Sequence, residues 1–193
     1  MNSDKPDGAT PLDPDESDGL IPGHITIREE LNEWETANIL EAEGWAFARA
    51  HTDLLSLSFI KRLHAKMFGN TWTWAGEFRH SEKNIGISWE RIPTALRELC
   101  DDTRYWLDHE TYGLDEIAGR FHHRLTLIHP FPNGNGRHAR LMTDLLLTAN
   151  GTPRFTWGRG DLNQSGDLRH RYISALRSAD DLDYDPLLDF LAR

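Results

Sequence analysis

The sequence predicts an all-α domain with one small β-hairpin, and three observations support this fold class. From residue 24 onward, most segments carry apolar side chains every three or four residues, as amphipathic helices do. Gly69 and Asn150-Gly151 stand where such segments stop, which is typical of helix C-termini. Residues 77–88 have no helical period and carry a late glycine, which indicates a β-hairpin or an extended flap.

The apolar spacing places a first helix from Thr26 to about Ala50, with Trp34 among its buried residues. Thr26 and Glu29 stand three residues apart, as a capping box requires. Pro93 is tolerated in a first helical turn, so another helix is expected to begin there. The remaining helices are expected at residues 57–68, 115–128, 136–149, 167–179 and 185–191.

Residues 1–23 differ in composition from the rest of the chain. They are rich in proline, glycine and acidic residues, which predicts a tail or an extended wrap and not a helix. Residues 24–193 are long enough to form one domain, and we expect a single helical domain there.

Charge and composition narrow the function classes. The formal net charge is −10, which disfavours direct nucleic-acid binding because that needs a basic face. The first residues are acidic with no apolar run after them, so no signal peptide is expected, and no stretch reaches membrane-spanning length. The single cysteine, Cys100, excludes an internal disulfide and favours a cytoplasmic location.

The most informative segment is His129–Arg140, which reads His-Pro-Phe-Pro-Asn-Gly-Asn-Gly-Arg-His-Ala-Arg. Its residues 134–136 lie where a loop becomes a helix, and free N–H groups and the helix dipole favour a phosphate there. Arg137 and Arg140 follow three residues apart, so we expect both to project to one side as phosphate ligands. This pattern indicates an anion site.

His129 stands at the mouth of this anion site. Pro130 follows it directly and pushes it out of helical geometry. A histidine there could take the proton from a hydroxyl that attacks a phosphorus atom. Phe131 is expected to point into the core and anchor the turn. Together these residues indicate chemistry on a nucleotide phosphate.

The same segment resembles the signature of the Fic family, also called Fic/Doc or fido: His-Pro-Phe-x-(Asp/Glu)-Gly-Asn-Gly-Arg-x-x-Arg. Every defined position matches except Asn133. Trp74–Arg79 is similar to the family's segment before its flap, and Tyr172–Asp180 is similar to its C-terminal helix. Residues 7–22 resemble the subgroup called mobile mystery protein B. The resemblance therefore covers nearly the whole chain and implies a helical bundle with a β-hairpin flap beside the active-site loop.

The resemblance implies transfer of AMP from ATP to a Ser, Thr or Tyr hydroxyl of a target protein. It makes His129 the general base, with Arg137 on the β-phosphate and Arg140 on the γ-phosphate. The α- and β-phosphates would be held by the loop residues Gly134, Asn135 and Gly136. Relatives that transfer phosphate instead carry a lysine at position 136, so the glycine favours AMP transfer.

The resemblance also implies roles outside the motif. In the flap, four residues would cover the nucleotide and guide the target by strand addition: Ile85, Gly86, Ile87 and Ser88. Tyr172 and Asp180 correspond to positions that line the adenine pocket in relatives. Helix packing and a helix-end cap explain these two residues equally well.

Asn133 stands where the family has the acid that holds Mg²⁺ on the phosphates. Mg²⁺ prefers hard, anionic oxygen ligands, and an amide oxygen lacks the charge. Three alternatives follow: weakly held Mg²⁺ that arrives with ATP, a different nucleotide donor, or a nucleotide-binding regulator without catalysis. Because His129 and Gly136 are both present, the sequence favours the enzyme.

Control and context complete the expectations. Thr26–Leu31 approaches the inhibitory pattern of many relatives but ends in Leu where they have Gly or Asn. Inhibition is therefore expected from an antitoxin-like partner protein or from residues 1–23. The subgroup implies a toxin-like bacterial protein. A metal hydrolase built on His122, His123 and His129 is disfavoured because no His-Glu-x-x-His motif occurs.

Overall fold

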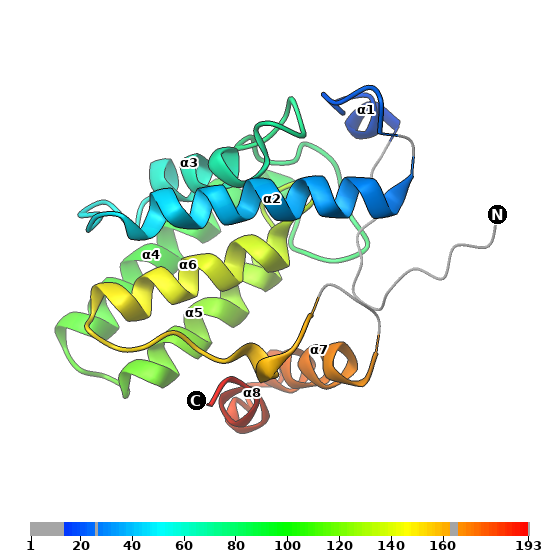
Figure 1. Cartoon of the computed structure of the whole chain (residues 1–193). Helices are drawn as coiled ribbons and strands as arrows, with labels where there is room; N and C mark the ends of the chain where they lie inside the picture. Colours follow the sequence, from blue (N-terminus) through cyan, green and yellow to red (C-terminus); the bar gives the residue numbers. More distant parts are fainter. Residues whose placement is uncertain (1–13, 26, 163–165, 193) are drawn as a thin grey trace.

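The computed structural model describes residues 14–25, 27–162 and 166–192, and they are mostly helical (Figure 1). The elements are α1 (Pro14–Ser17), α2 (Arg28–Phe47), α3 (Leu57–Phe68), η1 (Trp89–Arg91), α4 (Ile92–Asp108), α5 (Leu114–Ile128), α6 (Asn135–Ala149), η2 (Trp157–Arg159), α7 (Asp167–Asp180) and α8 (Asp185–Leu191). The all-α prediction is confirmed. Among the described helices, none is long and apolar enough to cross a membrane.

Helices α5 and α6 pack against each other in the middle of the molecule and belong to two hydrophobic clusters (Figure 1). The first cluster joins them to α2, α3 and α4, and Phe121 and Phe131 are fully buried in it. The second joins them to α7 and α8 through Ala118 and Leu147. The loop between α5 and α6 is therefore anchored in the packing of the central helix pair.

Helix α3 shows how local sequence sets the element bounds. Ser56 caps its start, since the Ser56 hydroxyl accepts the Phe59 N–H at 3.1 Å. Its apolar positions, Ile60, Leu63 and Met67, are fully buried, and Gly69 follows the last turn. The expected range of this helix agrees with the structure because caps and apolar spacing give the same answer.

Helix α2 corrects one expectation. Trp34 is 39% exposed, not buried, and its indole N–H donates to the Asn70 carbonyl at 3.4 Å. The buried positions begin one residue later, at Glu35, and continue through Asn38 and Ala42. Because the inner face of α2 carries the polar residues Glu35 and Asn38, the apolar spacing did not show which residues face the core. The expected capping box includes Thr26, which lies outside the described residues.

The expected β-hairpin is not formed. Residues 77–88 contain no strand ladder, and the isolated bridge in the described chain joins Leu20 to Trp72 elsewhere. The buried guanidinium of Arg79 instead donates to the carbonyls of Ser81 and Ile87, one on each arm of the segment. A side chain holds the arms where ladder hydrogen bonds were expected, so the segment is an extended flap.

The N-terminal segment also departs from expectation, because residues 14–17 form the short helix α1. Beyond it the chain runs along residues 71–73: Ile21 donates its N–H to the Thr71 carbonyl at 2.8 Å, and the Gly19 carbonyl accepts from Thr73 at 2.9 Å. Glu16 forms an ion pair with Lys83 of the flap at 2.6 Å. The described part of this segment therefore wraps the base of the flap. Residues 1–13 lie outside the described chain.

Candidate active site

His129 ends helix α5 in the left-handed conformation, with φ 53° and ψ 61°. This backbone geometry turns the chain out of the helix directly before Pro130. The residue is 7% exposed. Burial, and secondarily the nearby charge of Arg79, lower the pKa of His129 to about 4. The imidazole is therefore neutral at pH 7 and can accept a proton.

The motif loop is closed by Asn135. Its side-chain amide donates to the Phe131 carbonyl at 2.7 Å, and its side-chain oxygen accepts the Phe131 N–H at 2.8 Å. Phe131 is fully buried, as expected, and its ring stacks on His64 with centroids 3.7 Å apart. The side chain of Asn135 thus holds the loop, and what it can offer a phosphate is its backbone N–H.

His64 is a site residue that the sequence analysis missed. It is fully buried on α3, its Nε2 donates to the Asn133 carbonyl at 3.1 Å, and its Nδ1 accepts the Gly76 N–H at 3.0 Å. Burial holds the pKa of His64 well below its usual value, which keeps one neutral tautomer in place. The ring thereby joins the base of the flap to the motif loop. The sequence does offer one indication of this burial, because His64 follows Leu63 on the inner face of a predicted helix.

The two glycines of the motif, Gly134 and Gly136, differ in their structural requirements. Gly134 has φ +76°, and a Cβ there would lie 2.5 Å from the Phe68 ring, so the position requires glycine. At Gly136 the nearest atom to a Cβ would be Arg140 Nη1, at an ordinary 3.7 Å. Helix α6 begins without a side-chain cap. An anion site at its first-turn N–H groups stays a prediction.

The two motif arginines have partners on different helices, and their expected role as joint phosphate ligands stays a prediction. Arg137 Nη1 pairs with Glu35 of α2 at 2.7 Å, and its guanidinium lies over the Phe68 ring. Arg140 contacts the Tyr172 hydroxyl of α7, and burial lowers its pKa. In Figure 1, α6 runs between α2 and α7. One guanidinium is therefore held by α2 and the other by α7.

Asn133 turns its side-chain oxygen back into the loop, where it accepts the Gly134 N–H at 2.6 Å. This oxygen is neutral and already hydrogen-bonded. Among the described residues, no cluster of three His, Cys, Asp or Glu side chains could hold a metal ion. These donors do not fit a magnesium site made by the protein, because Mg²⁺ needs six oxygen ligands and prefers anionic ones.

Tyr172 and Asp180 take different places. Tyr172 is buried beside Arg140, and its hydroxyl lies 2.7 Å from His122 Nε2. Asp180 ends α7 and bonds His123 Nε2 at 2.8 Å, with the Tyr184 hydroxyl on the other ring nitrogen at 3.3 Å. Tyr172 thus reaches the motif through Arg140, whereas Asp180 belongs to a helix-end network. His122 is therefore part of the hydrogen bonds around Tyr172, and His123 is part of those around Asp180.

The flap lies directly against His129. Gly86 has φ +103°, and a Cβ there would come within 2.7 Å of the His129 Cβ. Its neighbour Ile85 is 37% exposed, while Ile87 and Ser88 are half-buried. The flap residues named from the resemblance are therefore beside His129 at Gly86, with Ile85 facing solvent.

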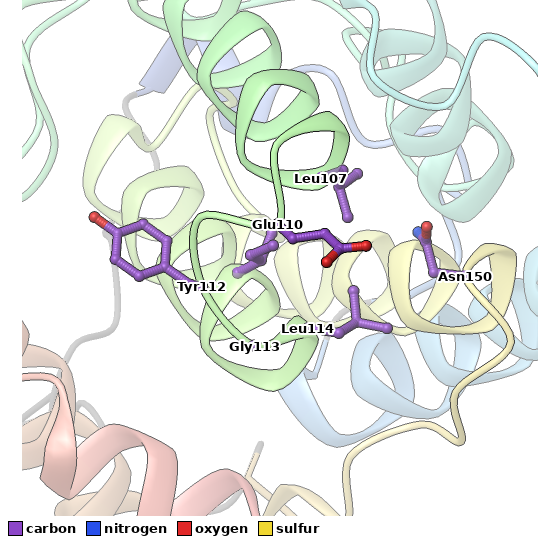
Figure 2. A pocket seen from close by; sticks show the side chains of 7 residues that line it. Leu107, Glu110, Tyr112, Gly113, Leu114 and Asn150 are labelled. Atoms are coloured by element: carbon purple, nitrogen blue, oxygen red, sulfur yellow. The ribbon is translucent and has the colours of Figure 1, made fainter.

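A pocket elsewhere in the molecule does not belong to this site (Figure 2). It is lined by Leu107, Glu110, Tyr112, Gly113, Leu114, Ile117 and Asn150. These residues surround the start of α5 and the end of α6, whereas the motif lies at the end of α5 and the start of α6. The two places are separated by the length of a helix, roughly 20 Å at 1.5 Å per residue.

Comparison with known proteins agrees with this geometry. Residues 54–147 match the Fic/DOC family. Protein adenylyltransferase fic-1 of Caenorhabditis elegans is 29% identical over 182 residues, which cover 92% of this chain and 34% of that protein. The chain thus spans about a third of this curated relative's length.

Solved structures show the same fold. Fic-1 from C. elegans (aa134–508) superposes with a TM-score of 0.67 at 27% identity, over 91% of this chain and 51% of that one. BepC from Bartonella tribocorum, solved with bound AMPPNP, gives a TM-score of 0.68 at 17% identity, over 91% and 95%. The matched family region includes the flap and the motif loop. The chain therefore contains a Fic/DOC family domain.

Proposed function

We propose that this chain is a protein adenylyltransferase that moves AMP from ATP to a hydroxyl of a target protein. The observation that carries the proposal is a buried, neutral His129 at the end of α5, on the loop that leads into the helix bearing Arg137 and Arg140. A candidate base, a helix N-terminus and two arginines thus follow one another along the loop and the start of α6. The relatives named protein adenylyltransferase supply the reaction class.

In the proposed reaction the target hydroxyl oxygen attacks the α-phosphorus of ATP. The new oxygen–phosphorus bond forms as the bond to the β-phosphate oxygen breaks, and pyrophosphate leaves. His129 takes the hydroxyl proton. The N–H groups at Asn135 and Gly136, with the two arginines, hold the negative charge of the phosphates during the transfer.

The pKa of about 4 at His129 belongs to the protein without nucleotide. A neutral imidazole is the form that a general base needs, but such a low pKa makes a weak base. The phosphates of ATP would place negative charge beside the ring and raise its pKa toward the working pH. Binding of the donor therefore strengthens the base that acts on it.

The remaining roles follow from the same site. Gly86 places the flap beside His129, so residues 85–88 are the segment that would guide a target strand. Tyr172 would approach the nucleoside from the Arg140 side. The target, the inhibitory partner and the toxin-like role stay predictions from the resemblance, and the cytoplasmic location stays a prediction from the single cysteine.

Magnesium enters the proposal as a companion of ATP. The Asn133 oxygen is neutral and bonded to Gly134, so phosphates and water would supply most of the ligands. The same observation favours a second candidate, a nucleotide-binding regulator with weakened catalysis. Asn133→Asp distinguishes them: gain of Mg²⁺-dependent turnover supports the weak-metal explanation, and no gain contradicts it.

The central test compares wild type with His129→Ala after incubation with ATP and Mg²⁺. His109→Ala, an exposed histidine at the end of α4, is the matched control. We expect AMP-sized additions on the protein itself, or label from α-tagged ATP on lysate proteins, to be lost in His129→Ala and retained in His109→Ala. Nucleotide binding without any transfer in wild type would overturn the enzyme in favour of the regulator.

A further inference from the structure

Arg79 is fully buried and bulkier than any other fully buried side chain in the described core, at 1% exposure. Every hydrogen bond recorded for its guanidinium in the described chain ends on a backbone carbonyl. On the flap these carbonyls belong to Ser81 and Ile87; at the end of α5 they belong to Ile128 and His129. The strongest contact to α5 joins Nε to the His129 carbonyl at 2.7 Å. One side chain therefore connects the flap to the residue proposed as the base.

The backbone of Arg79 adds to this connection, because its N–H donates to the Pro130 carbonyl at 2.9 Å. The residue thus binds the chain on both sides of the turn that takes His129 out of α5. Carbonyls at a helix C-terminus carry partial negative charge, so they stabilise a cation that has left water. This explains how a charged side chain is tolerated in the interior.

The number of acceptors explains why the residue is arginine. A guanidinium has five N–H donors in a fixed plane, which can reach carbonyls on two segments at once. A lysine has one nitrogen and cannot span the same distance. Gly86 closes the arrangement, since a Cβ there would lie 2.8 Å from Arg79 Nη2 and 2.7 Å from the His129 Cβ. Flap, guanidinium and base are in direct contact.

We propose that Arg79 is a positioning residue that fixes the flap and His129 relative to each other. Its role as a catalytic positioner rests on the proposed function, but the geometry that it sets does not. The charges of two flap residues, Arg79 and Lys83, lower the pKa of His129 beyond the larger effect of burial. Arg79 therefore acts on the base in two ways, by geometry and by charge.

The test separates these two effects in the intact chain without nucleotide or target. Arg79→Lys keeps the charge and loses the fork, and Arg79→Gln loses both. Arg91→Gln, at an exposed arginine just after the flap, is the matched control. The measurements are amide hydrogen exchange across residues 80–88 and the NMR titration of the His129 ring. Since neither needs transfer activity, failure of the proposed function would leave them informative.

We expect flap exchange to become roughly tenfold faster in both Arg79 variants, because charged hydrogen bonds are lost. The His129 titration should move upward toward about 6.5 in Arg79→Gln and less in Arg79→Lys. The control should match wild type. Folded Arg79 variants with wild-type exchange and titration would overturn the proposal.

Gly86→Ala covers the case in which the Arg79 variants do not fold. The residue is on the exposed flap, so the core does not depend on it, yet the added methyl must displace the flap, Arg79 or His129. Gly23→Ala, with open space around its Cβ, is the control. We expect faster flap exchange in Gly86→Ala alone. Equal exchange in both variants would contradict the contact on which the proposal stands.

Discussion

The two arginines of the motif are one helical turn apart, but the structure treats them differently. Arg137 is paired with a carboxylate, Glu35, which is 3% exposed and also accepts the Trp72 indole N–H at 2.7 Å. Arg140 faces a neutral group, the Tyr172 hydroxyl, and burial lowers its pKa. The first arginine is held by an ion pair, and the second is hydrogen-bonded to a neutral hydroxyl.

This difference indicates how each arginine would interact with a phosphate of a bound nucleotide. A phosphate that reaches Arg137 must share a guanidinium already engaged through Nη1, although five donors leave others for it. A phosphate that reaches Arg140 would compensate a cation that has lost water. We therefore expect Arg137 to contribute to both stability and binding, and Arg140 to contribute more to binding.

The largest effect on stability is expected when the ion pair between Arg137 and Glu35 is broken. Arg137→Ala leaves the carboxylate of Glu35 buried without its cation, so the free energy of unfolding should fall by about 3 kcal/mol. Urea unfolding measures it. The double variant Glu35→Gln with Arg137→Met removes both charges, keeps a side-chain oxygen that can accept the Trp72 indole N–H, and should recover most of the loss. A double variant as unstable as Arg137→Ala would show that the ion pair is not the cause.

On the Arg140 side, the stability of the fold should depend on pH through His122, which contacts the Tyr172 hydroxyl. Burial, then the charge of Arg140, lowers the pKa of His122 to about 3. The unfolded chain binds this proton near pH 6.5 and the folded chain does not, so stability falls as pH drops below about 6.5, at about 1.4 kcal/mol per pH unit. Asp144, with its pKa raised to about 6 mainly by burial, opposes this trend below pH 6.

Unfolding of wild type and His122→Gln across pH 4.5 to 7 isolates this contribution, because the other buried histidines are present in both. We expect a flatter dependence in the variant. Parallel curves would mean that His122 is protonated in the folded protein.

Substitution of Gly134 and of Gly136 by alanine should change the free energy of unfolding by different amounts. Gly134→Ala forces a Cβ against the Phe68 ring in a left-handed conformation, so about 2 kcal/mol of stability should be lost. Gly136→Ala, its control, meets ordinary contacts within a helix and should be neutral or slightly stabilising. Equal losses would refute the distinction between the two positions.

The smallest effect is expected from Tyr172→Phe, which removes the hydroxyl between His122 and Arg140. Loss of a buried hydrogen-bond partner should lower the free energy of unfolding by about 1 kcal/mol. Calorimetry with ATP titration would show whether the affinity falls as well. A loss as large as that of Arg137→Ala would remove the contrast between the two sides.

The sequence was a good guide wherever short-range rules act. The range expected for α3 agrees with the structure because Ser56, Gly69 and the apolar spacing coincide. The turn at His129-Pro130, the buried Phe131 and the helix start after Gly134 also follow from local backbone rules. The register of α2 was missed at Trp34 because its inner face carries Glu35 and Asn38, which break the apolar pattern.

The sequence by itself determined that helices would form, where most of them would end, and that His129 would stand on the loop before a helix start. Those features depend on neighbours a few residues away. The tertiary structure decided that Arg79 replaces hairpin hydrogen bonds in the flap and that His64 joins the flap to the loop. It also decided that Glu35 holds one arginine and Tyr172 the other. Each of these contacts joins residues far apart in the chain, and no local spacing encodes which distant carbonyl or carboxylate a buried side chain will meet.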